Sequence, residues 1–524
     1  MGTMSPSAGP VTGAATAAAT AAYAGRFARV ASHGYAPLGA TGLTVSRLGF
    51  GGYRVDDETP EHRAALEEAL ARGLNVIDTS TNYTDGGSER LIGAAVSDLV
   101  RGERLRREEL VIVSKIGYVQ GQNLALAEER EAAGRPFPEL VRYAPGVWHC
   151  IHPEFIEDQL GRSLARLRLG TLDVCLLHNP EYFLADAAHR DAGPLEAVRD
   201  EFYARLARAF RVFEAQVAAG ALRWYGVSSN TVAHAVDHPE ATSLARMLAA
   251  ARAAGGAGHH FRVLQLPLNL LEAGGARERN NPPDAAPAAR RTVLELARAE
   301  GVGVLVNRPL NAAAGRGMLR LADVAGPAGP APLEWQVPVV AALEAEYRRT
   351  IAPHLRVGAG SDAPEDFLRW ADRLSSLHGR LGGLAHWEPI ESQVRRLVGQ
   401  VVGALDGALG GALAEQWREW RDRYVRELDR LLDALRAEAA ARSRRQAASV
   451  SSAIDPLLPA DRRAEPLSRK ALWVVASTPG VSSVLVGMRR RTYVDDATAI
   501  LDWPPLEDPG PVYQAVAAMR ARGA

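Results

Sequence analysis

Lysine and cysteine are nearly absent from this chain of 524 residues. Only Lys115 and Lys470 are lysine among 61 basic residues, so arginine carries almost all of the positive charge. The two cysteines, Cys150 and Cys175, are too few for a disulfide framework. No uninterrupted apolar run approaches the roughly 18 residues that a membrane-spanning helix needs. In such a chain a lysine at a strand end indicates a functional site that arginine cannot form, because arginine stays charged whereas the pKa of a lysine can be shifted by its neighbours.

An excess of charge of either sign is also lacking. Basic and acidic residues number 61 each, and the formal net charge is zero. Binding to nucleic acid or to an anionic membrane surface depends on excess positive charge, which this composition does not supply. We therefore expect a soluble, cytoplasmic protein whose partner is a small molecule, with neither nucleic acid nor membrane as a partner. Assembly into a homo-oligomer stays open.

Residues 1–34 contain no acidic side chain and are rich in Ala, Ser, Thr and Gly. Such a segment has little apolar surface to bury, so we predict a disordered leader. Arg26 and Arg29 would also fit a transit peptide, but the whole chain is rich in alanine and arginine. The disordered leader is the preferred interpretation.

From residue 43 onward, short apolar segments alternate with segments of helical periodicity. Continuous apolar strands separated by helices are typical of a parallel sheet covered by helices. Eight such strands favour closure into an α/β fold of the (β/α)₈ TIM-barrel type over an open sheet. The predicted strands are Leu48–Gly52, Asn75–Asp78, Glu109–Lys115, Leu172–His178, Arg223–Ser228, Phe261–Leu266, Gly303–Asn307 and Val481–Gly487.

The alternation stops between residues 322 and 466, where no strand-like segment occurs. Trp417, Trp420, Tyr424 and Leu428 are spaced by three and four residues, which indicates one face of an amphipathic helix. We predict a large helical insertion (322–466) between barrel units one to seven (35–321) and an eighth unit with a C-terminal tail (467–524). A packed subdomain is the simplest interpretation of the insertion; a lid or a subunit interface is the alternative.

Four chemically distinctive side chains lie at or just after the ends of predicted strands: Asp78, Tyr83, Lys115 and His178. In a (β/α)₈ barrel the active site gathers at the carboxyl ends of the strands, so these residues should converge. A phenol with a pKa near 10 is a poor acid. A neighbouring lysine would lower that pKa, a carboxylate would hold the lysine, and a histidine would orient a carbonyl oxygen. We interpret the four as a catalytic group with Tyr83 as general acid/base.

These motifs resemble those of the aldo-keto reductase family. The resemblance covers about residues 37–319 and 468–501. It includes Asn-Val-Ile-Asp-Thr-Ser-Thr-Asn-Tyr around Asp78 and Tyr83, and the segments that contain Lys115 and His178. It implies a barrel that binds NAD(P) in an extended form, and an NAD(P)-dependent oxidoreductase that interconverts a carbonyl (aldehyde, ketone or sugar) and an alcohol by hydride transfer. A non-catalytic, nucleotide-binding regulatory protein of the same fold is the alternative.

The resemblance also implies a set of cofactor-binding residues. They lie at or after the carboxyl ends of predicted strands five to eight and are Ser228, Ser229, Asn230, Gln265, Asn307, Arg308, Pro309, Leu310, Gly487, Arg489, Arg490 and Asp496. Three consecutive arginines, 489–491, suit a 2′-phosphate, so NADP(H) is favoured, with NAD(H) as the alternative. Asn307 departs from the family, since many relatives have a stacking aromatic residue there. No metal site is predicted. Tyr118, Trp148 and Tyr182 are candidates to line the substrate pocket, and the sequence does not identify the substrate.

Overall fold

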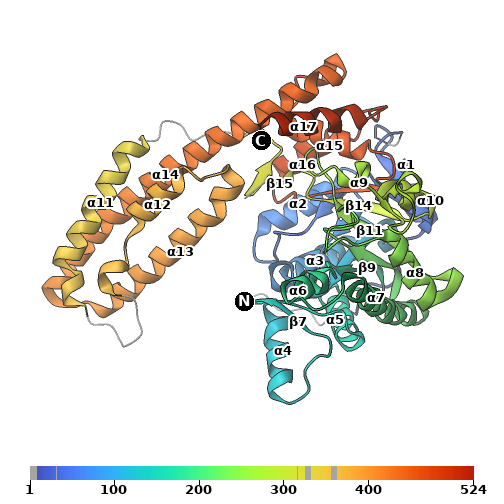
Figure 1. Cartoon of the computed structure of the whole chain (residues 1–524), viewed down its shortest axis with the longest axis horizontal. Helices are drawn as coiled ribbons and strands as arrows, with labels where there is room; N and C mark the ends of the chain where they lie inside the picture. Colours follow the sequence, from blue (N-terminus) through green and yellow to red (C-terminus); the bar gives the residue numbers. More distant parts are fainter. Residues whose placement is uncertain (1–8, 31, 315–316, 325–331, 356–362, 524) are drawn as a thin grey trace. The chain divides into compact units, whose positions relative to one another are not determined.

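The computed structural model describes residues 9–30, 32–314, 317–324, 332–355 and 363–523 (Figure 1). The chain divides into two compact units. The first consists of Met1–Leu310 and Ser468–Ala517, and the second of Asn311–Leu467 and Ala518–Ala524. This division begins the second unit at residue 311, whereas the sequence pattern placed the boundary after residue 321.

The first unit contains a closed barrel of eight strands, and every neighbouring pair is parallel. The predicted (β/α)₈ fold is therefore confirmed. In chain order the strands are β3 (Leu48–Gly51), β4 (Val76–Asp78), β5 (Val111–Ile116), β9 (Leu172–His178), β10 (Leu222–Ser228), β11 (Phe261–Pro267), β14 (Gly303–Asn307) and β17 (Ser483–Val486).

Helices follow the strands and cover the barrel. They are α2 (Pro60–Ala71), α3 (Gly87–Arg101), α5 (Pro153–Leu167), α7 (Leu195–Ala218), α8 (Leu244–Gly255), α10 (Val293–Ala299), α15 (Leu467–Ala476), α16 (Arg491–Thr498) and α17 (Gly510–Gly523). The strands are mainly apolar because both faces are covered: all seven residues of β9 and all six of β5 are buried. Val76, Val113, Val174 and Leu305 belong to one buried cluster.

The N-terminal segment differs from the prediction. Residues 17–25 form helix α1 (Ala17–Gly25), capped by the Thr16 side chain, so the expectation of a disordered leader is wrong for the described part. Tyr23 is fully buried, and its hydroxyl lies 2.6 Å from the carbonyl oxygen of Leu70. The backbone N–H of Ala15 donates to the buried carboxylate of Asp173. Alanine-rich chain forms helix readily once a few larger side chains anchor it. Residues 1–8 and 31 lie outside the described residues.

Residues 117–150, which make up most of the long connection between β5 and α5, contain structure that the sequence pattern did not predict. They form β6 (Tyr118–Val119), helix α4 (Gln122–Ala132), β7 (Val141–Ala144) and β8 (Val147–His149). The three strands make an antiparallel sheet in the order β6-β8-β7. A shorter connection after β9 carries α6 (Tyr182–His189). Before the barrel, β1 (Tyr35–Pro37) and β2 (Thr44–Ser46) form a hairpin.

The second unit has a hydrophobic core of its own, which confirms the predicted large helical insertion. Its elements are the hairpin β15 (Asn311–Ala314) and β16 (Gly317–Arg320) and the helices α11 (Leu333–Thr350), α12 (Trp370–His378), α13 (Leu384–Ala408) and α14 (Gly411–Ile454). The predicted apolar face of α14 is buried: Trp417, Trp420 and Tyr424 stack along the helix and are at most 1% exposed. Among the described residues, no helix has the length and apolarity to cross a membrane.

Candidate active site

The four predicted catalytic side chains meet at the carboxyl ends of the barrel strands. Asp78 is the last residue of β4 and His178 the last of β9, while Lys115 is the next-to-last residue of β5. Tyr83 begins a 3₁₀ turn (Tyr83–Gly86) that follows β4 after the short segment 79–82. The chain reaches this arrangement because parallel strands in a barrel all end on the same face.

Lys115 is the central residue of the group. Its side chain is fully buried, and its ammonium donates to Asp78 Oδ2 at 2.7 Å, to the carbonyl oxygen of Thr79 at 2.7 Å and to Tyr83 Oη at 3.1 Å. The other carboxylate oxygen of Asp78 accepts from Gln265 Nε2 at 2.8 Å. All three protons of the ammonium and both oxygens of the carboxylate therefore have partners, which a buried ion pair requires.

Burial raises the pKa of Asp78 and lowers the pKa of Lys115, and the attraction between the two charges opposes both shifts. Burial raises the pKa of Tyr83 well above its usual value, and the charge of Asp78 adds to that shift. The net shift of the Tyr83 pKa is therefore upward, and the lowering effect expected of Lys115 stays a prediction. Tyr83 is a neutral phenol at physiological pH and carries a proton that it can donate.

His178 is enclosed by aromatic rings. The ring of Tyr118 meets it edge-on at 4.7 Å between centroids and that of Tyr83 at 5.8 Å. Burial lowers the pKa of His178 well below its usual value, with smaller contributions from Lys115 and His149. The imidazole is therefore neutral at physiological pH. Its Nδ1 lies 3.0 Å from Ser80 Oγ, and its backbone carbonyl accepts from His149 Nε2 at 2.7 Å.

The predicted cofactor residues of strands five to seven adjoin this group. Gln265 Oε1 accepts from Ser228 Oγ at 3.0 Å and from Asn307 Nδ2 at 3.3 Å, so Gln265 links these residues to Asp78. Asn307 Oδ1 is buried and has no hydrogen-bond partner among the described residues. Ser229 points elsewhere, toward Thr242 Oγ1 at 2.9 Å.

Asn230 is held by a residue that the sequence pattern did not single out. Its backbone N–H donates to Glu181 Oε1 at 2.6 Å. Glu181 is 5% exposed, and its second carboxylate oxygen is buried without a partner in the described part of the chain. Burial raises the pKa of Glu181 to about 7. No motif identifies this residue; its position three residues after His178 is the only sequence signal.

The residues after β14 and β17 form two further groups. In the first group, Arg308 has a left-handed φ of 52° and donates to Glu272 Oε1 at 2.9 Å. The next residue, Pro309, is buried, and Leu310 is half-buried.

In the second group, which follows β17, Gly487 is exposed, Arg489 is half-buried, and Arg490 lies 3.8 Å from Glu61. Asp496 accepts from Arg469 Nε and Ser468 Oγ, both at 2.8 Å. In the structure Asp496, which lies in α16, is thus bonded to two residues of α15.

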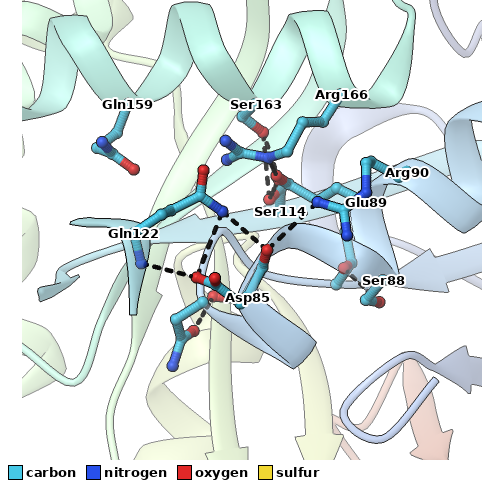
Figure 2. Close-up of polar contacts among 12 residues, drawn as sticks. Asp85, Ser88, Glu89, Arg90, Ser114, Gln122, Gln159, Ser163 and Arg166 are labelled. Carbon is cyan, nitrogen blue, oxygen red and sulfur yellow. Dashed lines mark hydrogen bonds and ion pairs between the residues drawn. The ribbon is translucent and has the colours of Figure 1, made fainter. Parts of the chain in front are cut away.

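A buried polar network supports the turn that carries Tyr83 (Figure 2). Glu89, fully buried at the start of α3, accepts from Ser114 Oγ and Ser163 Oγ at 2.5 Å each and from Arg166 Nε at 2.6 Å. These donors come from β5 and α5, so one carboxylate joins three elements beneath the site. The Asp85 carboxylate accepts from the backbone N–H of Gln122 at 3.0 Å, which ties the turn to the 117–150 connection.

Comparison with known proteins gives a consistent set of similarities. Residues 47–320 match the model of the Aldo/keto reductase family. The chain is 28% identical over 151 residues to the NADH-specific methylglyoxal reductase of Escherichia coli, which covers 27% of this chain and 40% of that protein. It is 30% identical over 174 residues to a D-threo-aldose 1-dehydrogenase of Pseudomonas, covering 31% and 49%. The chain spans less than half the length of these curated relatives.

Among solved structures, an aldo-keto reductase from Bacillus halodurans is similar to this chain with a TM-score of 0.44 and 16% identity. The alignment covers 93% of this chain and 96% of that protein.

Proposed function

This chain belongs to the aldo/keto reductase family, and from that membership we propose that it is an NAD(P)-dependent oxidoreductase. It would interconvert a carbonyl compound, which is an aldehyde, a ketone or a sugar, and the corresponding alcohol by hydride transfer. The proposal assigns Tyr83 as the general acid/base and places the enzyme in the cytoplasm.

The observation that carries the proposal is the contact of Lys115 with both Asp78 and Tyr83, at 2.7 and 3.1 Å. Because the ammonium donates to the phenol oxygen, the Tyr83 O–H proton is left to point toward a substrate oxygen. As Tyr83 gives up this proton, the nearby ammonium would stabilise the phenolate that forms, in a site with little water to compete. Asp78 keeps Lys115 charged, and Gln265 holds Asp78 in place.

The hydride would come from a bound nicotinamide cofactor, because no side chain supplies one. The residues present fit such a group: Ser228, Gln265 and Asn307 form a polar cluster beside Asp78, and the buried Asn307 Oδ1 lacks a partner among the described residues. Arg308, Pro309 and Leu310 would lie along the pyrophosphate. Arg489 and Arg490, beside Gly487, would hold the adenosine end, which favours NADP(H). The NADH-specific relative keeps NAD(H) as the alternative.

The proposed substrate pocket has aromatic walls. Tyr53 is 62% exposed and its ring meets that of Tyr83 at 5.2 Å. On the side of His178, the hydroxyls of Tyr118 and Tyr182 lie 3.3 Å apart. Trp148 belongs to the same sheet as Tyr118 and stacks under Arg142. Tyrosine rings offer flat apolar faces with polar tips, which suit sugars and aryl carbonyls.

The test is a fluorescence titration of the purified protein with NADPH and NADH, followed by turnover against a panel of aldehydes, quinones and sugars. Saturable binding with turnover is expected. Binding without turnover on the whole panel would favour the regulatory alternative. Binding of neither nucleotide would contradict the assignment of the site.

A further inference from the structure

The turn that carries Tyr83 has an unfavourable backbone conformation. Thr84 and Asp85 both lie in the left-handed region, with φ of 48° and 52° and ψ of 40° and 47°. No other two consecutive non-glycine residues have a positive φ in the part of the chain that the structure describes. In this region the Cβ atom comes too close to the following carbonyl oxygen, and aspartate tolerates it better than threonine. Such a turn persists only where its surroundings hold it.

Gln122, the first residue of α4, contacts both the backbone and the side chain of Asp85 (Figure 2). Its Nε2 donates to the Asp85 carbonyl oxygen at 2.8 Å and to Oδ1 at 3.3 Å, and its backbone N–H donates to Oδ1 at 3.0 Å. Carbonyl and carboxylate oxygens only accept, so these partners fix the amide orientation. Because the two groups of Asp85 change their relative direction when its backbone rotates, bonds to both hold the left-handed conformation.

Two glycines allow the close approach between α4 and the turn. Gly121 has a φ of 54°, and a Cβ atom at this residue would overlap Asp85 Oδ1. Gly86 has a φ of 81°, and a Cβ atom there would lie 2.9 Å from Arg166 Cδ and 3.1 Å from Gln122 Nε2. Glycine is therefore favoured at both positions. The contact is specified by the sequence and is more than a chance meeting of surface side chains.

Two other side chains support the turn. The Thr84 hydroxyl donates to the carbonyl oxygen of Val55 at 2.6 Å, and Arg90 Nη1 donates to the carbonyl oxygen of Asp85 at 3.3 Å. Neither bond involves the Asp85 carboxylate, which accepts only from Gln122 among the described residues. Loss of the Gln122 side chain should therefore loosen the turn without unfolding it.

We propose that Gln122 is a positioning residue for the general acid: by holding Asp85 in the left-handed conformation, it keeps the Tyr83 hydroxyl in place for proton donation. The connection that carries Gln122 also carries Tyr118, whose ring lies 4.7 Å from that of His178. One connection thus both positions the acid and forms a wall of the proposed pocket. This inference rests on the proposed function for the chemical role of Tyr83.

The position of Tyr83 can be followed by ¹⁹F NMR in the full-length protein labelled with 3-fluorotyrosine. The Tyr83 signal is identified by its loss in Tyr83→Phe. We expect this signal to shift and broaden in Gln122→Ala, because the turn then samples other conformations. Gln122→Lys supplies a donor for both oxygens of Asp85 and should restore the natural signal.

The control for this measurement is Glu128→Ala, which changes an exposed residue of the same helix. It should leave the Tyr83 signal unchanged. A Tyr83 signal that stays the same in Gln122→Ala would overturn the proposal, whether or not the protein turns over a substrate.

Turnover separates a positioning role from a merely structural one. With NADPH and 4-nitrobenzaldehyde, Gln122→Ala should lower kcat about tenfold, the size expected for lost hydrogen bonds to a charged group, while KM and NADPH affinity stay within about twofold. Gln122→Lys should recover most of the kcat. A loss of nucleotide affinity in step with kcat, or an unchanged kcat, would contradict the positioning role.

A pH profile adds a readout that a loosened fold would not produce. Gln122→Glu places a second carboxylate where Nε2 lay 3.3 Å from Asp85 Oδ1. Two such carboxylates repel when both are ionised, and at lower pH they share a proton, which again donates a hydrogen bond. The kcat of Gln122→Glu, relative to the natural protein, should therefore rise as the pH falls from about 8 to about 5. A ratio independent of pH would rule out the proposed contact.

The NMR measurement needs neither nucleotide nor turnover. Failure of the proposed function would be seen separately, as absence of nucleotide binding by the natural protein.

Discussion

At the scale of single residues, Lys115 is central to the proposed active site because it contacts both Asp78 and Tyr83. Lys115 could be identified in the sequence because lysine is scarce in this chain and because this lysine lies at a strand end. Asp78, Tyr83 and His178 could be identified from the motifs around them. The bond from Gln265 to Asp78 joins residues 187 positions apart, and the contact between Ser80 and His178 depends on side-chain directions. Neither can be predicted from one sequence, because strand spacing fixes which residues approach but not which atoms meet.

Asp78→Asn should destabilise the protein strongly. The substitution leaves the buried ammonium of Lys115 without its counter-charge, and breaking a buried pair in this way typically costs about 3–5 kcal/mol. The free energy of unfolding, measured by urea denaturation, should fall by that amount. Asp158→Asn is the matched control, because Asp158 pairs with Arg162 at the surface and such pairs contribute about 0–1 kcal/mol. Equal losses in both variants would contradict the account.

Glu181 should make stability depend on pH. Burial raises its pKa from 4.5 to about 7 in the folded protein. Its contribution to stability is therefore complete below about pH 4.5 and is lost as the pH rises through 7, by about 3 kcal/mol in all. Glu181→Gln should remove this loss and be more stable than the natural protein at pH 8. The exposed Glu157→Gln is the control. An unchanged pH profile of unfolding in Glu181→Gln would disprove the assignment.

At the scale of elements, the eight barrel strands were predictable because each is a continuous apolar segment between helices. Helix α1 was not, since its alanines resemble a flexible leader until Tyr23 is seen to be buried. Strands β6 to β8 are two to four residues long, which is too short for a periodic pattern to emerge. The long amphipathic α14 was predictable from the spacing of its aromatic residues.

Tyr23→Ala should show that α1 is part of the folded barrel unit. The substitution leaves a cavity where a fully buried ring packed, and such losses cost about 3–5 kcal/mol. Tyr23→Phe keeps the ring and removes only the hydroxyl, so it should cost about 1 kcal/mol. Chemical denaturation of both variants measures the difference. A Tyr23→Ala protein as stable as the natural one would show that the segment does not contribute to folding.

At the scale of the whole molecule, the chain carries two units with separate hydrophobic cores. The break in strand–helix alternation predicted the second unit. The first residues of that unit form the hairpin β15–β16, which no apolar run in the sequence predicted. Excision of residues 322–465 and their replacement by a short linker should leave a folded barrel with a cooperative thermal transition. Aggregation of the excised protein would mean that the helical unit is needed to complete the barrel core.

The central claim is that Tyr83 supplies the proton for a nucleotide-dependent reduction. Tyr83→Phe keeps the ring and removes only the acidic hydroxyl, so it separates chemistry from binding. The decisive measurement compares NADPH binding and carbonyl turnover in this variant and in the natural protein, with the same preparations. The account predicts nucleotide affinity within about twofold and turnover reduced by at least the 10²–10⁴-fold typical of a lost general acid. Retained turnover, or loss of nucleotide binding in step with activity, would contradict it.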